Sequence, residues 1–599
     1  MYFEQIDQPS DVKRLKLNQL ETLAAEMRQA LLQKLSRRGG HFGPNFGMVE
    51  ATIALHYVFD SPRDKLVFDV SHQTYCHKML TGRKKAFLSE QHYDDVSGYS
   101  NPQESPHDFF TIGHTSTSVS LACGLAKARD LKGGKENIIA VIGDGSLSGG
   151  EALEGLDFAS ELRSNLIIVV NDNQMSIAEN HGGLYQNLRL LRETDGKAEC
   201  NFFRAMGLGY VFVKNGNDLS QLIAAFQMVK DAAHPVVVHI CTQKGKGFAA
   251  AEKDRESWHW CTPFGMANGK PVAAVEEEDY SSVTASFLLE RMKEDKTLVA
   301  ITSATPAVLG FTPEKRREAG SQFVDVGIAE ETAVALASGI AVNGGKPVYG
   351  VYSTFVQRAF DQLSQDLCIN NSPATILVYA ASIYGMNDVT HLGIYDIPMM
   401  ANIPNLVYLA PTTKEEYLAM LDWSLAQRAH PVAIRVPGGP LVSSGQAVTK
   451  DFSKLNQFEV VQRGNRAAIL ALGAFFPLGK AAAQAIAVQT SVQPTLINPR
   501  YISGLDVDLL EQLKEDHEVI VTLEDGILDG GFGEKIARFY GRSHQKVLNY
   551  GLQKKFLDRY DVAEVLRQNH LTAEQIAGDV AELLCSDCLL YTSPSPRDA

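Results

Sequence analysis

The sequence lacks any long hydrophobic run. No stretch of its 599 residues approaches the roughly 18 consecutive apolar residues that a membrane-spanning helix needs. The amino-terminal residues 1–5 also lack the charged and apolar regions that are typical of a secretory signal. These absences argue against a helical membrane protein, and we expect no membrane partner.

Positive charge is also in short supply. The chain has 56 Lys and Arg residues against 70 Asp and Glu residues, which gives a net charge of −14 at pH 7. The basic residues are dispersed rather than gathered into a stripe, so we expect no nucleic-acid partner. The eight cysteines are scattered, and their one Cys-x-x-Cys pair, Cys585 and Cys588, lies at the tail. This usage fits a reduced cytosol, and we expect a cytoplasmic protein.

The composition that remains is that of an ordinary globular protein, 45% hydrophobic and 21% charged. The chain is too long for one core and suggests about three or four domains. Short apolar runs, such as 138–142, 298–302 and 467–472, alternate with helical patterns along the whole chain. Such alternation predicts an α/β fold of mainly parallel, doubly wound sheets.

Pro, Gly and acidic clusters divide this pattern into blocks. Pro and Gly residues between 263 and 271, followed by Glu276 to Glu278, indicate a linker, and Pro437-Gly438-Gly439-Pro440 ends the next block. We therefore expect domains at 1–270, 280–442 and 455–585. Residues 588–599 resemble translated sequencing-adapter DNA, and we predict that this tail is not native.

The most informative segment joins two apolar runs and the polar loops that follow them. Gly143-Asp144-Gly145-Ser146 follows one run, and Asn171-Asp172-Asn173 follows the next. Between them, Leu153, Leu156, Ala159 and Leu162 recur at helical spacing, so the unit reads as strand, loop, helix, strand. The carboxyl ends of parallel strands are where open α/β sheets bind ligands. Asp144 and Asn173 would there offer two hard oxygen ligands to a Mg²⁺ that also holds a diphosphate.

Several further motifs occur in a fixed order and carry a family resemblance. They are Gly39-Gly40-His41-Phe42, Asp69-Val70-Ser71-His72-Gln73-Thr74-Tyr75, Gly113-His114-Thr115-Ser116, Lys244-Gly245-Lys246-Gly247-Phe248, Ile328-Ala329-Glu330 and Tyr352-Ser353-Thr354-Phe355-Val356-Gln357-Arg358. With the magnesium signature, the chain resembles the 1-deoxy-D-xylulose-5-phosphate synthase family of the transketolase superfamily from about residue 10 to about residue 584.

This resemblance implies an activity. Members of the family are homodimers with three-domain, transketolase-like subunits that use thiamine diphosphate and Mg²⁺. They transfer a two-carbon unit from pyruvate, with release of CO₂, to glyceraldehyde 3-phosphate. The product, 1-deoxy-D-xylulose 5-phosphate, is a precursor of isoprenoids, thiamine and pyridoxal.

The resemblance also assigns roles to residues. Asp144, Asn173 and the Met175 carbonyl would bind Mg²⁺, and Glu330 would activate the cofactor's pyrimidine, with His41, His259 and His391 as proton donors and acceptors. The cofactor contacts would be His72, Gly113, His114, Thr115, Gly145, Ser146, Asn173, Phe248, Glu330 and Phe355. The substrate contacts would be Tyr352, Arg358, Asn387 and Arg435.

The chain also departs from the family pattern around the aldehyde acceptor. Ala380 and Gly438 stand where the family has two arginines for the acceptor phosphate, and Asn387 stands where it has an aspartate. Two alternatives therefore stay open: a carboligase or ketol transferase that uses another aldehyde, and a catalytically inactive partner subunit. Losing two arginine contacts would weaken phosphate binding a hundredfold or more, at about 1.4 kcal/mol per decade. On this ground we expect glyceraldehyde 3-phosphate to be a poor acceptor.

Overall fold

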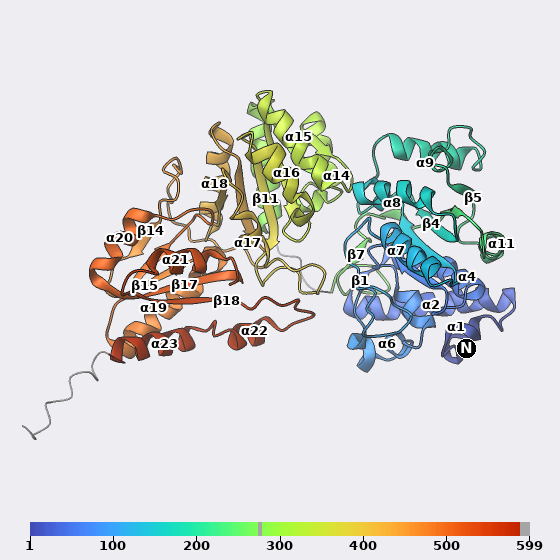
Figure 1. Cartoon of the computed structure of the whole chain (residues 1–599), viewed down its shortest axis with the longest axis horizontal. Coiled ribbons are helices and arrows are strands. Elements are labelled where there is room, and N and C mark those ends of the chain that lie inside the picture. Colours follow the sequence, from blue (N-terminus) through green and yellow to red (C-terminus); the bar gives the residue numbers. More distant parts are fainter. Residues whose placement is uncertain (273–277, 587–599) are drawn as a thin grey trace, which may run out of the picture. The chain divides into compact units, whose positions relative to one another are not determined.

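The computed structural model describes residues 1–272 and 278–586, and the described chain forms two compact units (Figure 1). The first unit contains the residues before the linker together with the short segment Val326–Ala329, and the second contains Glu278–Asp325 and the chain from Glu330 onward. The predicted tail at 588–599 and part of the predicted linker lie outside the described residues. The three-domain division at the boundaries given above stays a prediction.

A five-stranded parallel sheet forms the centre of the first unit, in the order β2-β3-β4-β6-β5. Its strands are β2 (Lys65–Phe68), β3 (Ile138–Gly143), β4 (Leu166–Asp172), β5 (Gly209–Val213) and β6 (Pro235–Cys241). The helices around it include α2 (Leu17–Arg38), α4 (Val49–Val58), α5 (Tyr75–Leu80), α7 (Ser118–Leu131), α8 (Gly150–Glu161), α9 (Gly183–Glu193) and α11 (Leu219–Val229). A short pair, β1 (Gly40–His41) and β7 (Trp260–Cys261), is antiparallel.

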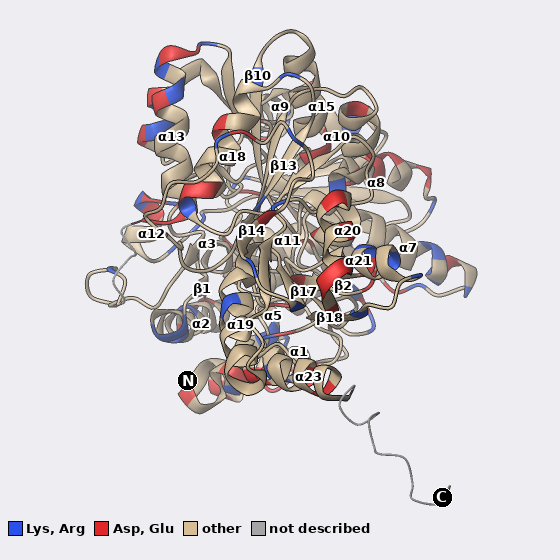
Figure 2. Ribbon diagram, turned by 90° about the vertical axis from the view of Figure 1, so that its left-hand side faces the viewer, with Lys and Arg blue, Asp and Glu red and all other residues tan. Residues whose placement is uncertain are grey.

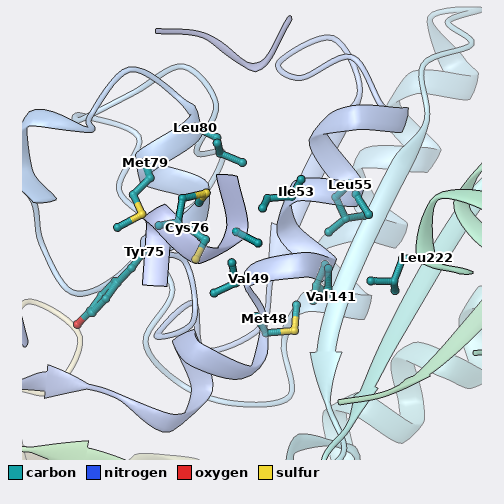
Figure 3. Close-up of a cluster of buried hydrophobic side chains, with 14 of the residues drawn as sticks. Met48, Val49, Ile53, Leu55, Tyr75, Cys76, Met79, Leu80, Val141 and Leu222 are labelled. Atoms are coloured by element: carbon teal, nitrogen blue, oxygen red, sulfur yellow. The ribbon is translucent and has the colours of Figure 1, made fainter. Parts of the chain in front are cut away.

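Alternation along the central strands explains why both faces of this sheet are covered. In β3, Ile139 and Val141 belong to a core that includes side chains of α2, α4 and α11. The residues between them, Ala140 and Ile142, belong to a second core that includes α7 and α8. Figure 3 shows the first core, where α4 and α5 bring their apolar side chains together near Val141. A strand that is buried on both faces reads as a continuous apolar run, as the sequence predicted.

The second unit contains two more sheets. The first, in the order β12-β13-β11-β10-β8-β9, is parallel throughout. Its strands are β8 (Leu298–Thr302), β9 (Phe323–Asp325), β10 (Lys346–Tyr352), β11 (Thr375–Ala381), β12 (Val407–Leu409) and β13 (Val432–Pro437). Neighbouring helices are α13 (Tyr280–Glu294), α15 (Glu330–Val342), α17 (Asp396–Met400) and α18 (Lys414–Ala426).

The other sheet has the order β14-β16-β15-β17-β18, and only its edge strand β14 is antiparallel. Its strands are β14 (Glu459–Gln462), β15 (Arg466–Ala471), β16 (Thr495–Asn498), β17 (His517–Ile527) and β18 (Lys546–Leu552). Its helices include α19 (Phe476–Thr490), α20 (Val507–Asp516), α21 (Phe532–Tyr540) and α23 (Ala573–Ser586). The predicted class, α/β with mainly parallel sheets, is confirmed.

The helices in the described part of the chain carry charged residues of both signs and lack long apolar stretches, as the composition predicts. None of the helices in residues 1–272 and 278–586 is long and apolar enough to cross a membrane. Figure 2 shows Lys and Arg interspersed with Asp and Glu, for example along α13.

A buried chain of titratable groups links α4 and α5. His56 Nε2 lies 2.9 Å from His77 Nδ1, and His77 Nε2 lies 3.0 Å from Asp108 Oδ1. Arg83 donates to the other oxygen of Asp108 at 2.7 Å. Burial lowers the pKa of His56 well below its ordinary value and also lowers that of His77. Both imidazoles are therefore neutral in the folded protein at pH 7.

This chain makes stability sensitive to mild acid. Below about pH 6.5 the unfolded histidines bind protons that the folded ones do not, so stability is lost as pH falls. Each histidine whose pKa is lowered adds to this loss, by at most about 1.4 kcal/mol per pH unit. We expect the urea concentration at the unfolding midpoint to decrease when the pH is lowered from 7.5 to 5. The decrease should be smaller in His56→Gln. His181→Gln, at a position without this packing, should keep the wild-type slope, and an equal slope in all three proteins would contradict the account.

Candidate active site

The predicted magnesium ligands follow two neighbouring strands of the first unit. β3 and β4 are parallel partners, and their register pairs Gly143 with Asn171. Asp144 comes directly after β3, and its backbone N–H donates to the Asn171 carbonyl at 3.0 Å. Asn173 comes directly after β4. The two strand ends therefore bring Asp144 and Asn173 to the same edge of the sheet, where open α/β sheets bind ligands.

Asp144 is only 1% exposed, and its two oxygens differ. Oδ2 accepts a hydrogen bond from Asn180 Nδ2 at 2.9 Å, whereas Oδ1 is buried without a hydrogen-bond donor in the described part of the chain. Burial, and then the charge of Asp172, raise the pKa of Asp144 well above its ordinary value. A bound Mg²⁺ would remove both penalties, so this unsatisfied oxygen fits a metal ligand.

A loop folds closely over Gly145. A Cβ at position 145 would lie 2.6 Å from Ser176 Cβ and 2.9 Å from Ser176 Cα, so only glycine fits. Within the loop, Met175 N donates to Asn173 Oδ1 at 3.2 Å, and Ser176 N donates to Ala178 O at 2.9 Å. These contacts hold Asn173 and the Met175 backbone beside Asp144 and the turn that carries Ser146.

Asp69, which sequence reasoning left unassigned, organises the neighbouring loop. Its carboxylate accepts hydrogen bonds from Ser116 N at 2.8 Å and Ser118 N at 2.9 Å, at the start of α7. The preceding loop residues Gly113, His114 and Thr115 are therefore tied to the end of β2. The non-glycine residues Val70, Ser71, Ser116 and Gln174 all have positive φ, from 56° to 76°. Such strain clusters at ligand sites, where the surrounding structure enforces it.

Three predicted histidines form one cluster in the first unit. The ring centroids of His41 and His72 are 5.0 Å apart, those of His72 and His259 are 5.3 Å apart, and those of His41 and His259 are 5.7 Å apart. Tyr99 joins the cluster at 5.7 Å from His41. Burial, followed by the charges of Lys244, His72 and His41, lowers the pKa of His259 well below its ordinary value. His259 is therefore a neutral imidazole at pH 7 and can donate or accept a proton.

Lys244 is a second residue that sequence reasoning left without a role. It is 2% exposed, and its Nζ donates to Ser176 O at 2.7 Å. Burial lowers its pKa to about 7, against the opposing charge of Asp144. The Lys-Gly-Lys-Gly-Phe motif pointed to Lys244 in the sequence, whereas no motif pointed to Asn180.

A cavity of about 340 Å³ adjoins this region. Its lining includes Asp144, Asn180, Tyr185, Arg189 and Arg192.

Asp172, His239 and Cys241 also come close enough to suggest a metal site. However, Asp172 Oδ2 already accepts from Arg192 NH1 at 2.5 Å and lies 2.9 Å from His239 Nε2. The guanidinium occupies the place that a metal cation would take, so this cluster reads as a buried ion pair.

Phe248 lies among aromatic side chains of the first unit. Its ring centroid is 5.0 Å from that of Trp258, 5.2 Å from Phe42 and 5.8 Å from Phe264. This is the packing of a core aromatic residue, and the predicted contact with the cofactor stays a prediction.

In the second unit, Glu330 begins α15 and is 3% exposed. Burial raises its pKa to about 6, against the opposing charge of Arg358. Arg358 NH1 lies 3.5 Å from Glu330 Oε2, which has no hydrogen-bond donor among the described residues. A buried carboxyl with a pKa this close to neutrality can hold or release a proton.

Other predicted residues lie near Glu330 in the same unit. Phe355 packs against Tyr352 at 5.7 Å and against His391 at 5.5 Å between ring centroids. His391 Nδ1 lies 2.8 Å from Thr390 Oγ1 and 3.2 Å from Asp388 Oδ1. The carboxylate of Asp388 therefore fixes the orientation of this imidazole.

The acceptor-side departures have a steric explanation. A Cβ on Gly438 would lie 2.4 Å from Gly385 Cα and 2.7 Å from Tyr384 O, so the backbone around Gly385 fills the space that a side chain at 438 would need. Ala380 has a positive φ of 51°, and its carbonyl would lie 2.2 Å from a Cβ on Gly385. Asn387 is held through its carbonyl, which accepts from Arg559 N at 2.7 Å.

Gly438→Ala should therefore destabilise the second unit. Backbone atoms cannot move aside as a flexible side chain can, so we expect a loss of about 1–3 kcal/mol in the free energy of unfolding, the usual effect of overpacking. Gly339→Ala is the matched control, because a Cβ there has no neighbour within 4 Å. Equal urea midpoints for the two variants would show that the loop at 384–385 can shift.

Arg435, a predicted substrate contact, is held in buried ion pairs with Asp396 and Asp525. It is 2% exposed, its Nε donates to Asp396 Oδ2 at 2.6 Å, and its NH1 donates to Asp525. Its NH2 bonds Asp396 Oδ1 at 3.3 Å and the Gly393 carbonyl at 3.4 Å. With its guanidinium engaged by the protein, this placement argues for a structural role and against binding of a substrate phosphate.

Comparison with known families defines the class. Residues 276–441 match the model of the transketolase pyrimidine-binding domain, and residues 456–576 match the model of the transketolase C-terminal domain. The protein is thus an enzyme of the transketolase class, whose cofactor is thiamine diphosphate with Mg²⁺. A solved transketolase from Leishmania mexicana is 16% identical, covering 96% of this chain and 98% of its own, with a TM-score of 0.43.

The amino-terminal part defines the family. Residues 3–201 and 194–242 match the model of 1-deoxy-D-xylulose-5-phosphate synthase. The synthase of that name from Shouchella clausii is 38% identical over 98% of this chain and 99% of its own length. The one from Thermomicrobium roseum is 38% identical over 98% of both chains. The chain belongs to the 1-deoxy-D-xylulose-5-phosphate synthase family.

Proposed function

We propose that this protein transfers a two-carbon unit from pyruvate, with loss of CO₂, to glyceraldehyde 3-phosphate, giving 1-deoxy-D-xylulose 5-phosphate. The observation that carries the proposal is the pair of oxygen donors at adjacent strand ends, Asp144 and Asn173, with one Asp144 oxygen left unsatisfied. The length of the similarity to synthases favours glyceraldehyde 3-phosphate over the two alternatives, another aldehyde acceptor and an inactive subunit.

The first unit carries the residues proposed to bind the diphosphate. Asp144, Asn173 and the Met175 carbonyl would hold Mg²⁺, and the backbone amides of Gly145 and Ser146 would bind the diphosphate. Lys244, whose Nζ donates to Ser176 O in the loop over Gly145, would add a positive charge when the anionic diphosphate is bound. Thiamine diphosphate, when bound, supplies the nucleophilic carbon and the electron sink that decarboxylation of pyruvate requires.

The second unit carries the residue proposed for proton transfer with the pyrimidine. Glu330 would hydrogen-bond to a pyrimidine nitrogen, and its raised pKa suits a group that shares a proton with a weak base. With a pKa of about 6 Glu330 is largely ionised at neutral pH, yet burial raises its proton affinity enough for it to share a proton with a pyrimidine nitrogen. Phe355, which packs against His391, would offer an aromatic face to the pyrimidine.

The histidines would handle protons on the substrates. His41, His72 and His259 form a cluster that would stabilise a developing alkoxide by donating hydrogen bonds. His391, oriented by Asp388, offers a second proton-transfer group in the other unit. Tyr352 offers a hydroxyl, and burial raises its pKa, so it remains a donor at neutral pH.

The acceptor's phosphate gives a direct test of this proposal. The similarity to synthases reverses the expectation, drawn from the two missing arginines, that glyceraldehyde 3-phosphate is a poor acceptor. With pyruvate as donor, we expect kcat/KM for glyceraldehyde 3-phosphate to exceed that for glyceraldehyde by a hundredfold or more, the effect of about two charge-assisted contacts made by other residues. A ratio near one would show that the phosphate is not recognised and would return the activity to a carboligase with another acceptor. Absence of CO₂ release with either aldehyde would favour the inactive subunit.

The proposal also includes an oligomeric state and a cellular location. We expect a homodimer, as in the family that the chain resembles, and sedimentation velocity would check it through the mass of the main species. We also expect the enzyme to work in the cytoplasm, where its scattered, unpaired cysteines would remain reduced.

A further inference from the structure

A second cavity, of about 590 Å³, lies in the second unit away from Glu330 and its neighbours. It is lined by the loop before β12, the loop before β13, a turn before β14, the 503–505 loop and one face of α21. Its lining residues are Ala401, Asn402, Ile403, Pro404, Asn405, Leu406, Val407, His430, Leu455, Asn456, Ser503, Gly504, Leu505, Lys535 and Arg538. The volume is within the usual range of small-molecule sites, roughly 300–1,000 Å³.

The charge of this cavity is opposite to that of the chain. The whole protein carries a net charge of −14, yet none of the lining residues is Asp or Glu. Lys535 and Arg538 lie three residues apart on α21, a spacing that places both side chains on one face of the helix. His430 adds a third nitrogen group to the lining.

The hydrogen bonds within the cavity leave donors without acceptors. Lys535 Nζ, which has three N–H groups, donates to the carbonyls of Ala401 at 3.2 Å and Ile502 at 3.1 Å, and forms no ion pair with a described carboxylate. Burial lowers its pKa to about 8, so it is still largely cationic at pH 7. The hydroxyl of Ser503 accepts from Tyr408 N at 3.1 Å, which leaves its own O–H available. A site rich in cationic and neutral donors and without carboxylates is one that binds oxyanions.

The loops of this cavity are also held in a costly conformation. Asn405 and Asn456 have positive φ values of 66° and 63°. A Cβ on Gly504 would lie 2.1 Å from Asn456 Oδ1, so only glycine lets the 503–505 loop approach the turn at 456. Strained backbone of this kind is concentrated at ligand sites.

We propose that this cavity binds the phosphate group of a phosphorylated small molecule, with Lys535 and Arg538 as its cationic contacts. The apolar side chains of Ile403, Leu406 and Leu455 would face the organic part of such a ligand. Since α21 and the 401–407 loop both contribute, an occupant would tie the C-terminal sheet's helix to the sheet of β8–β13. The site is separate from every residue to which the proposed reaction assigns a role.

The test is a binding measurement on the full chain, with the cofactor site saturated by thiamine diphosphate and Mg²⁺. Inorganic phosphate is the probe, and calorimetry or ³¹P line broadening reports binding. We expect saturable binding that weakens tenfold or more in Lys535→Gln/Arg538→Gln, and more modestly in Arg538→Gln. The matched control Arg542→Gln/Lys546→Gln removes the same charge outside the lining and should bind phosphate as the wild type does.

The outcomes separate this site from the proposed reaction. Turnover of pyruvate in phosphate-free buffer should be the same in the wild type and in Arg538→Gln, whose exposed side chain leaves folding unaffected. Wild-type phosphate binding in both pocket variants, or no saturable binding at all, would overturn the proposal. An equal loss in the control pair would show general charge attraction, which also overturns it.

Discussion

Glu330→Gln should lose about two to four orders of magnitude in kcat while still binding the cofactor. Proton transfer by a positioned group accounts for a factor of about 10²–10⁴, and a glutamine keeps the shape of the side chain but cannot take up or release the proton. The diphosphate end of the site belongs to other residues, so the thiamine diphosphate concentration at half-saturation should change little. Steady-state CO₂ release from pyruvate over a range of cofactor concentrations separates the two effects.

The neighbouring acid provides the control for this variant. Glu331 is adjacent in sequence but less buried, and Glu331→Gln should retain nearly full activity. Because burial raises the pKa of Glu330 to about 6, its ionisation at pH 7.5 destabilises the fold, and Glu330→Gln should unfold at the same or a higher urea concentration. Near-normal turnover in Glu330→Gln would remove this residue from the chemistry.

Asp144→Ala should raise the cofactor and Mg²⁺ concentrations needed for half-maximal activity by a hundredfold or more. Asp144 is one of only two side chains assigned to the metal, and a charged ligand in a buried site contributes several kcal/mol to Mg²⁺ binding. Titration of chelator-treated protein with Mg²⁺ at fixed thiamine diphosphate gives the shift directly.

Asp157→Ala on the exposed face of α8 is the matched control, because it removes the same charge from the same unit. It should leave both half-saturation values unchanged. Full activity of wild-type protein after dialysis against a chelator would contradict the magnesium assignment altogether.

Much of the fold could be predicted because its strands are buried on both faces. The apolar runs at 138–142 and 166–170 became β3 and β4, and the run at 298–302 became β8. The helix between β3 and β4 was also predicted, although Leu153, expected on its buried face, is 37% exposed. Periodicity locates a helix well, but the neighbours that cover its edges are set by tertiary packing.

The site was predicted where its residues directly follow predicted elements. Asp144 and Asn173 come at strand ends, and Glu330 comes at a helix start, so their placement followed from the elements themselves. The engagement of Arg435 could not be foreseen, since its partners Asp396 and Asp525 are 39 and 90 residues away in the chain. Asn180 and Lys244 were overlooked for the same reason, because each meets Asp144 or its loop only through tertiary contact.

The close packing around Gly438 limits which residues can bind the phosphate of the aldehyde acceptor. A missing arginine could be read from the sequence, but the sequence could not show that the backbone at Gly385 occupies the vacated space. Any phosphate contact for the acceptor must come from residues other than those at positions 380 and 438.

The identity of the product tests the central claim most directly. Purified protein would be incubated with ¹³C-labelled pyruvate, glyceraldehyde 3-phosphate, thiamine diphosphate and Mg²⁺, and the product identified by mass spectrometry and NMR. The account predicts labelled CO₂ and 1-deoxy-D-xylulose 5-phosphate carrying two pyruvate carbons, with neither formed when the cofactor is omitted. A product that lacks pyruvate carbons, or the same yield without thiamine diphosphate, would contradict it.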